Sequence, residues 1–128
     1  MKKRISILGS TGSIGMQTLD VARNLNINVI GLSANKNIDL LEKQIREFKP
    51  KAVSVSSSEN KENLKSRIED LKTEVYFGQE GLVKIATLEE NEMVINSIVG
   101  IAGLIPTIEA IRSKKDIALA NKESLVAA

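Results

Sequence analysis

The feature that most constrains the fold is a glycine-rich loop between a short apolar strand and a helix. Residues 5–8 are mostly apolar and form a segment short enough for a buried strand, and residues 13–24 carry apolar side chains at roughly helical spacing. Between them runs the sequence Gly9-Ser10-Thr11-Gly12-Ser13-Ile14-Gly15. A strand that enters a helix through several glycines is typical of α/β proteins whose loop approaches a phosphate closely. The opening therefore predicts an α/β fold with an anion site after its first strand.

The rest of the chain repeats this alternation of short apolar and longer amphipathic segments. Further strands are expected at residues 28–32, 52–55, 74–77, 93–97 and 116–119. Helices are expected at residues 38–48, 59–71, 79–88, 103–113 and from residue 123. Strands that alternate with helices favour parallel pairing, because each crossover helix returns the chain to the same edge of the sheet. We therefore expect an α/β, Rossmann-like fold: a doubly wound, mostly parallel sheet with helices on both faces.

Composition limits the chemistry that this fold can carry. The 128 residues include no His and no Cys, which excludes a Ser-His-Asp triad, a thiolate nucleophile and the common zinc sites. A net charge of +2 is too small to indicate a nucleic-acid-binding surface, and one Tyr and two Phe form no stacking platform for bases. The longest apolar runs are too short to span a membrane. We expect a cytoplasmic ligand-binding module or a fragment of a larger enzyme, with no nucleic-acid or membrane partner, rather than a complete catalyst.

The spacing within the glycine loop favours a dinucleotide as the ligand. The loop has the pattern G-x-x-G-x-x-G, and no Lys-Ser/Thr pair follows its last glycine as in a P-loop. Glycines let the backbone approach a pyrophosphate, while the first amides of the helix point at its charge. Thr11 and Ser13 can add hydroxyl donors. The alternative is an ordinary strand-to-helix turn without a ligand.

The end of the second predicted strand discriminates between the two nicotinamide dinucleotides. Proteins that bind NAD usually place an Asp or Glu there, about 20 residues past the loop, to hold the ribose 2′-hydroxyl. Here the strand leads into Asn35-Lys36-Asn37, which contains a cation and no acid. Lys36 and its neutral neighbours would attract a 2′-phosphate, which favours NADP(H). Alternatively, Asn37 caps the next helix and Lys36 is a solvated surface charge.

Two further segments follow predicted strands at the same edge of the sheet. Residues 98–103 (IVGIAG) contain two glycines that could pack against a flat nicotinamide or ribose, and residues 120–124 are ANKES. Open α/β sheets bind ligands at this edge. Asn121 offers a donor and an acceptor, Lys122 a cation for an anionic substrate, and Glu123 an acceptor for ribose hydroxyls. Two structural alternatives remain. Asn121 could cap a helix whose solvated first turn contains Lys122 and Glu123, or the Lys122–Glu123 pair could support neighbouring loops.

Three segments of the chain together resemble the 1-deoxy-D-xylulose 5-phosphate reductoisomerase family. They are residues 7–15 with Thr18-Leu19-Asp20 in the following helix, residues 98–107, and residues 119–126. The resemblance runs in register along the whole chain. The glycine loop alone is shared with other NADP-dependent reductases, such as semialdehyde dehydrogenases and dihydrodipicolinate reductases, but the Asn-Lys-Glu-Ser segment argues against them. A non-enzymatic dinucleotide-sensing module is the alternative from a different class.

The resemblance implies an oxidoreductase of isoprenoid biosynthesis by the methylerythritol phosphate route. Members of the family isomerise and reduce 1-deoxy-D-xylulose 5-phosphate to 2-C-methyl-D-erythritol 4-phosphate, using NADPH and a divalent metal, magnesium or manganese. The family's motifs imply that the pyrophosphate is held by Thr11, Gly12, Ser13 and Ile14, the 2′-phosphate by Asn35, Lys36 and Asn37, the nicotinamide half by Asn121 and Glu123, and the substrate by Lys122. The family often has glycine where this chain has Asn35, and Asn tolerates a left-handed backbone better than most residues.

The resemblance further implies that residues 1–128 are an NADPH-binding domain that lacks the catalytic and carboxyl-terminal parts of the family. The metal-binding Asp and Glu of the family and its substrate-phosphate site are expected beyond Ala128. No catalytic residue and no metal ligand is therefore assigned within this chain. We expect the chain alone to bind NADPH weakly and to be inactive, and the full-length enzyme to be a homodimer in the cytoplasm.

Overall fold

A single parallel sheet organises the computed structural model, which describes residues 3–98 and 101–119. Its strands are β1 (Arg4–Leu8), β2 (Asn28–Ser33), β3 (Ala52–Val55), β4 (Glu74–Phe77), β5 (Met93–Asn96) and β6 (Asp116–Leu119). They lie in the order β4-β3-β2-β1-β5-β6, and all neighbours pair in parallel. Each strand begins and ends within one residue of its predicted segment, so the expected parallel sheet is confirmed.

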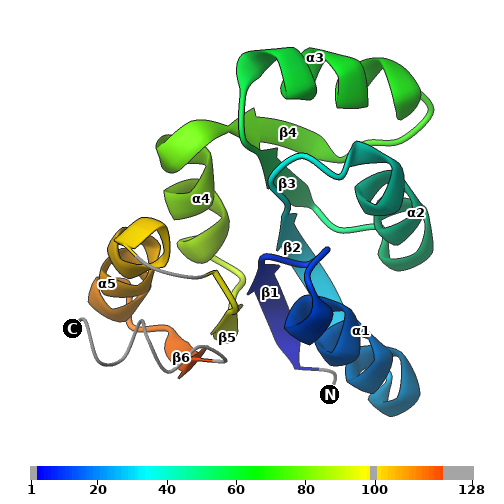
Figure 1. Ribbon diagram of the computed structural model, residues 1–128. Coiled ribbons are helices and arrows are strands. Elements are labelled where there is room, and N and C mark those ends of the chain that lie inside the picture. Colours follow the sequence, from blue (N-terminus) through cyan, green and yellow to red (C-terminus); the bar gives the residue numbers. More distant parts are fainter. Residues whose placement is uncertain (1–2, 99–100, 120–128) are drawn as a thin grey trace.

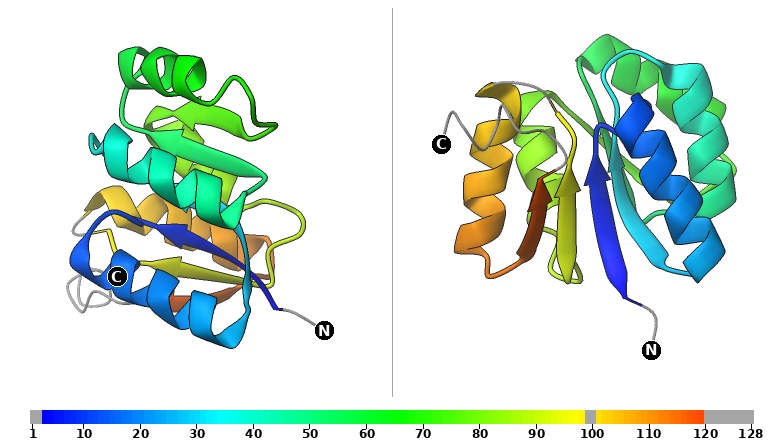
Figure 2. Two further views of the ribbon diagram at one scale, coloured as in Figure 1. Left: turned by 90° about the vertical axis from the view of Figure 1, so that its right-hand side faces the viewer. Right: turned by 60° about the horizontal axis from the view of Figure 1, so that its bottom comes forward.

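Helices cover both faces of this sheet (Figures 1 and 2). Within the described residues they are α1 (Ser13–Leu25), α2 (Ile38–Phe48), α3 (Ser58–Arg67), α4 (Gly78–Ala86), the short 3-10 helix η1 (Ile101–Gly103) and α5 (Leu104–Arg112). Figure 1 shows α1, α2 and α3 on one side of the sheet and α4 and α5 on the other. The order of the strands reverses at β1. The chain first runs outward from β1 to β4, and α4 then carries it back to β5 on the other side of β1. The doubly wound prediction is therefore confirmed, while the helix expected from residue 123 lies outside the described residues.

Two apolar cores, one on each side of the sheet, explain why the strands have nearly continuous apolar sequences. Successive side chains of a strand point to opposite faces. In β1, Ile5 and Ile7 pack under α1 and α2, whereas Leu8 belongs to the core beneath α4 and α5. All three side chains are buried. A parallel strand covered on both faces needs apolar residues at most positions, which is what the sequence shows.

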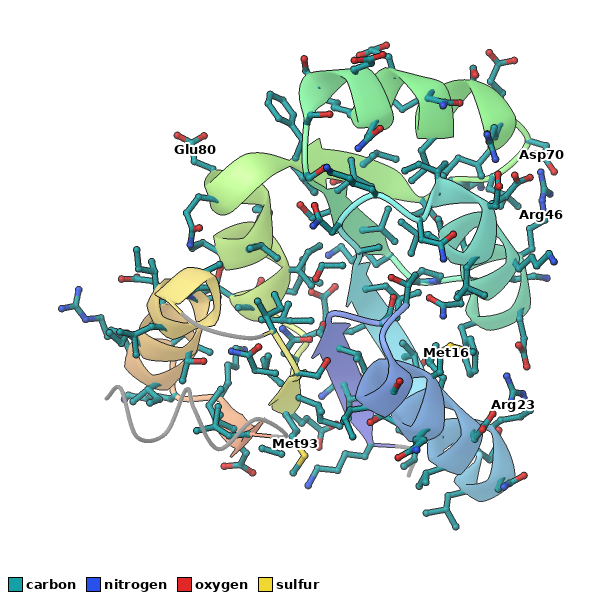
Figure 3. All side chains as sticks on the ribbon, viewed as in Figure 1. Met16, Arg23, Arg46, Asp70, Glu80 and Met93 are labelled. Carbon is teal, nitrogen blue, oxygen red and sulfur yellow. The ribbon has the colours of Figure 1, made fainter. Side chains whose placement is uncertain are left out.

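Helix α3 is shorter than predicted, because α2 supplies a partner for its carboxyl end. The sequence pattern predicted a helix over residues 59–71, but α3 ends at Arg67. The guanidinium of Arg46 donates to the Arg67 carbonyl over 2.9 Å and to Asp70 over 2.9 Å. Figure 3 shows Arg46 on α2 close to Asp70 in the turn that follows α3. The turn still buries Ile68, one of the apolar residues of the predicted stripe.

Ion pairs on the surface predict how stability depends on pH. Hydrogen bonds from Arg46 and Arg67 lower the pKa values of Asp70 and Asp39. The folded state then binds fewer protons than the unfolded chain, so this stabilisation is complete above the ordinary carboxyl pKa and is lost as the pH falls through the lowered values. We expect the thermal midpoint to be constant between about pH 6 and 7, since no His titrates, and to fall modestly below about pH 4. Melting curves followed by circular dichroism test this, and a transition near pH 6 would contradict it.

Candidate functional site

The candidate site is a pocket at the carboxyl ends of the strands, where the strand order reverses between β1 and β5. It is lined by Gly9, Thr11, Gly12, Ser33, Ala34, Asn35, Ser56, Gly78, Gln79, Leu82, Ser97, Ile98 and Ala102. Such a crevice is the general ligand site of open α/β sheets. Its lining combines small residues, hydroxyls and amides with a few apolar side chains and includes no carboxylate. The pocket therefore suits an anionic ligand that also has an apolar part.

The three glycines of the loop have different structural roles. Gly9 has a positive φ of 83°, and a Cβ there would lie 2.7 Å from Ser97 Oγ. A Cβ on Gly15 would lie 2.1 Å from the Gly9 carbonyl oxygen, because the first turn of α1 packs directly on the loop. At Gly12 the nearest atom would be 3.8 Å away. Gly9 and Gly15 are thus required by the fold, whereas the absent side chain of Gly12 leaves space in the pocket.

The amino end of α1 offers backbone donors beside this space. Gly12 is the N-cap and supplies no side-chain hydrogen bond, and the first turn contains no acidic residue. The early amides of a helix lack intrahelical acceptors and carry the positive end of its dipole, so they attract an anion. The structure brings the predicted residues together: Thr11 and Gly12 line the pocket, and Ser13 and Ile14 form the exposed start of the helix.

Two serines at the ends of neighbouring strands fix the loop, and sequence reasoning missed both. The N–H of Gly9 donates to Ser33 Oγ over 3.0 Å, and the N–H of Ser10 donates to the Ser33 carbonyl over 2.8 Å. From the other side, Ser97 Oγ bonds to the carbonyl oxygens of Leu8 and Gly9 at 2.8 and 3.1 Å. The available signal was a hydroxyl residue at the carboxyl end of each predicted strand that flanks the first.

The predicted 2′-phosphate residues form the exposed turn between β2 and α2. Asn37 is the N-cap of α2, and its Oδ1 accepts a hydrogen bond from the Leu40 N–H over 3.2 Å. The capping alternative is therefore correct for Asn37, and its side-chain NH₂ group is not consumed by that bond. Lys36 and Asn35 are exposed beside it. Asn35 does not have a positive φ, so this turn does not need the glycine that is common in the family.

The second predicted group of residues is described only in part. Asn121, Lys122 and Glu123 lie outside the described residues, as does Gly100.

The prediction that Gly103 packs against a ligand is wrong. Gly103 is buried, and a Cβ there would lie 2.8 Å from the Ile98 carbonyl oxygen and 3.1 Å from Asn96 Nδ2. Asn96 Nδ2 donates to the Gly103 carbonyl over 2.7 Å and to Thr107 Oγ1 over 2.6 Å. The physical role of this glycine is to let α5 begin close against the end of β5.

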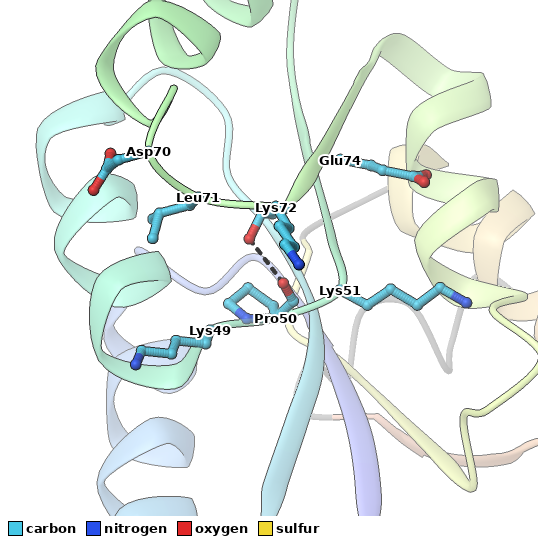
Figure 4. A pocket seen from close by; sticks show the side chains of 8 residues that line it. Lys49, Pro50, Lys51, Asp70, Leu71, Lys72 and Glu74 are labelled. Atoms are coloured by element: carbon cyan, nitrogen blue, oxygen red, sulfur yellow. Dashed lines mark hydrogen bonds between the residues drawn. The ribbon is translucent and has the colours of Figure 1, made fainter.

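A second hollow lies at the opposite edge of the sheet, before β3 and β4 (Figure 4). It is lined by residues 49–51 and 70–74, and Thr73 Oγ1 donates to the Pro50 carbonyl over 2.8 Å. Its charged side chains have both signs, with three Lys, one Asp and one Glu. The amino ends of parallel strands do not form the ligand crevice of such sheets, so we assign no function to this hollow.

Two absences within the described residues concern metals and membranes. No group of three or more His, Cys, Asp or Glu side chains lies close enough to hold a metal ion there. None of the helices in that part of the chain is long and apolar enough to cross a membrane. The described residues thus do not fit a metal centre, and no chemistry through a metal is assigned to them.

The fold and the site together define a Rossmann-like α/β domain with a crevice at the carboxyl ends of its strands. The chain belongs to the 1-deoxy-D-xylulose 5-phosphate reductoisomerase family, whose sequence model matches residues 5–128. The resemblance inferred from the three motifs is therefore confirmed. Because the chain belongs to this family, the semialdehyde dehydrogenase and dihydrodipicolinate reductase families are excluded.

The chain spans about a third of the length of the reductoisomerases that it matches. The chain is 66% identical to the 1-deoxy-D-xylulose 5-phosphate reductoisomerase of Acetivibrio thermocellus and 58% identical to that of Ruminiclostridium cellulolyticum, covering 100% of itself and 34% of each relative. Among solved structures, the Zymomonas mobilis enzyme in complex with NADPH is 37% identical with a TM-score of 0.92, and the chain covers 34% of it. A DOX-P reductoisomerase in complex with NADPH, fosmidomycin and magnesium is 38% identical, with a TM-score of 0.91 over 97% of this chain and 31% of that one.

Proposed function

We propose that residues 1–128 are the NADPH-binding domain of a 1-deoxy-D-xylulose 5-phosphate reductoisomerase. The observation that carries the proposal is the amino end of α1, which has no side-chain cap and lies beside a pocket without carboxylates. The same pocket is lined by Asn35, which precedes the cation Lys36 in a loop without acidic residues. Support comes from two similar solved structures that are complexes with NADPH.

Each part of the dinucleotide has a matching chemical environment in this proposal. The first amides of α1, at Ser13 and Ile14, and the Thr11 hydroxyl receive the pyrophosphate, which can approach because Gly12 has no side chain. Lys36 and the asparagines on either side of it receive the 2′-phosphate as a charge-assisted contact. Following the family resemblance, Asn121 and Glu123 contact the nicotinamide half and Lys122 the substrate.

The activity of the longer enzyme is part of the same proposal. Bound NADPH supplies a hydride for reduction, and the described residues bind and orient it. The substrate is 1-deoxy-D-xylulose 5-phosphate, and the product is 2-C-methyl-D-erythritol 4-phosphate. A magnesium or manganese ion is held by residues beyond this chain. We propose that the full-length enzyme is a homodimer in the cytoplasm.

Cofactor titration of the 128-residue chain tests the binding step. We expect saturable enhancement of NADPH fluorescence and weaker binding of NADH, because only NADPH carries the phosphate that Lys36 attracts. Absence of saturable NADPH binding, or equal affinity for the two cofactors, would contradict the proposal.

Turnover by the same chain is expected to be absent, since no metal cluster occurs in its described residues. The measurement is NADPH oxidation in the presence of 1-deoxy-D-xylulose 5-phosphate and manganese. Metal-dependent turnover by the chain alone would show that the catalytic groups are already present.

A further inference from the structure

A buried glutamine interrupts the apolar stripe of α2. Gln44 lies beside Leu41 and Ile45, and its exposed fraction is 6%. A buried side-chain amide destabilises the fold unless its donor and acceptor both find partners. An apolar side chain at this position would need no hydrogen-bond partner, whereas the Gln44 amide needs both an acceptor and a donor.

Both ends of the Gln44 amide bond to one residue of the glycine loop. Ser10 Oγ donates to Gln44 Oε1 over 2.7 Å, and Gln44 Nε2 donates to the Ser10 carbonyl over 3.0 Å. Ser10 is fully buried, and its own N–H donates to the Ser33 carbonyl over 2.8 Å. The side chain, carbonyl and N–H of Ser10 are thus all fixed, two of them by Gln44.

Fixing the Ser10 carbonyl also orients the next amide. The peptide unit is planar and trans, so the Ser10 carbonyl and the Thr11 N–H point in opposite directions. Because the carbonyl faces Gln44 on α2, the Thr11 N–H faces away from α2. Thr11 lines the candidate pocket. Gln44 therefore controls the direction of a backbone donor at the point where the pyrophosphate is proposed to lie.

We propose that Gln44 is a positioning residue that holds the glycine loop in its phosphate-receiving conformation. The inference rests on the proposed function, and it adds a link between two parts of the site. Helix α2 begins directly after the Lys36 turn at its capping residue, Asn37, and holds Ser10 two turns later through Gln44. One rigid helix therefore sets the spacing between the pyrophosphate loop and the 2′-phosphate turn.

The first test needs no ligand. In Gln44→Met, which keeps the length of the side chain and removes both bonds, we expect the loop amides of Ser10 and Gly12 to exchange with solvent about tenfold faster, while sheet amides are unchanged. Amide exchange followed by NMR measures this. The matched control is Gln17→Met, the same substitution at an exposed position of α1. Unchanged loop exchange in Gln44→Met would overturn the inference.

The second test separates positioning from general loss of structure. We expect Gln44→Met to raise the Kd for NADPH about tenfold and to leave that for adenosine 2′-monophosphate, which has no pyrophosphate, within about twofold. Loss of both ligands in equal proportion would overturn the inference. If Gln44→Met does not fold, Ser10→Ala removes one of the two bonds and should raise the NADPH Kd about threefold, again without affecting the monophosphate.

The outcomes distinguish this inference from the proposed function. If the unchanged chain does not bind NADPH, the proposed function fails, and the ligand role of Gln44 fails with it. If the unchanged chain binds NADPH and Gln44→Met binds both ligands as the unchanged chain does, only the positioning inference fails.

Discussion

Lys36→Glu is expected to raise the Kd for NADPH about a hundredfold and to leave the Kd for NADH within about twofold. The substitution removes a cation from the exposed turn after β2 and places a carboxylate next to the proposed 2′-phosphate. A lost charge-assisted hydrogen bond and a new repulsion act in the same direction. NADH has a hydroxyl at that position, and this hydroxyl can donate a hydrogen bond to the carboxylate. The preference between the two cofactors should therefore fall or invert.

A charge-matched control separates local contact from net charge. Lys72→Glu makes the same change of charge at an exposed residue on the opposite edge of the sheet, where Figure 4 shows Lys72 beside β4. We expect it to leave both Kd values within about twofold, since charges beyond about 10 Å are largely screened at ordinary salt. Fluorescence titration of the three proteins at one salt concentration gives the comparison. Equal weakening by the two variants would show that Lys36 acts only through the overall field.

Periodicity was sufficient to locate the strands, because parallel strands buried on both faces have short and nearly continuous apolar sequences. The ends of helices were harder to predict. Helix α3 ends at Arg67 through a hydrogen bond from Arg46, which lies on another helix. Such a contact depends on how two elements meet in space, and no local pattern around residue 67 reveals it.

In the candidate site, too, the residue types could be predicted from the sequence, whereas their contacts with distant segments could not. The glycine loop and Lys36 turn were identifiable, since backbone approach and charge require particular residue types at particular places. A hydroxyl residue at a strand end is visible in the sequence, but the partner it holds is not, because Ser97 bonds to residues almost 90 positions earlier and Gln44 to a residue 34 positions earlier. Gly103 illustrates the converse: its sequence context suggested a ligand, whereas its neighbours in space show packing.

The absence of His and Cys from the sequence is compatible with this site. Holding a dinucleotide requires backbone amides, hydroxyls and a few cations, all of which the described residues contain. In the proposed function, the cofactor supplies the hydride, and proton or metal chemistry is left to other parts of a longer enzyme. Composition therefore constrains what this domain does alone, but not the class of enzyme to which it belongs.

Gly15→Ala is expected to lower the free energy of unfolding by about 3 kcal/mol. The new Cβ would lie 2.1 Å from the Gly9 carbonyl oxygen and 2.7 Å from Ser10 Cα. Both are backbone atoms of a loop that is braced from β2 and β5, so neither can move without breaking the hydrogen bonds that hold it. Thermal or chemical denaturation followed by circular dichroism measures the loss. A stability equal to that of the unchanged chain would mean that α1 does not pack against the loop as described.

Gly12→Ala is the matched substitution at which the effects on folding and binding should separate. Gly12 has φ −80° and ψ 173°, which Ala adopts readily, and its Cβ would have 3.8 Å to the nearest atom. The lower entropy of the unfolded chain offsets the weaker N-cap, so stability should stay within about 0.5 kcal/mol. The same methyl group would occupy space where the pyrophosphate approaches the amides of α1, and we expect the NADPH Kd to rise about tenfold. If Gly12→Ala were instead as destabilising as Gly15→Ala, the glycines of the loop would serve folding alone, and the space at Gly12 would not be a phosphate site.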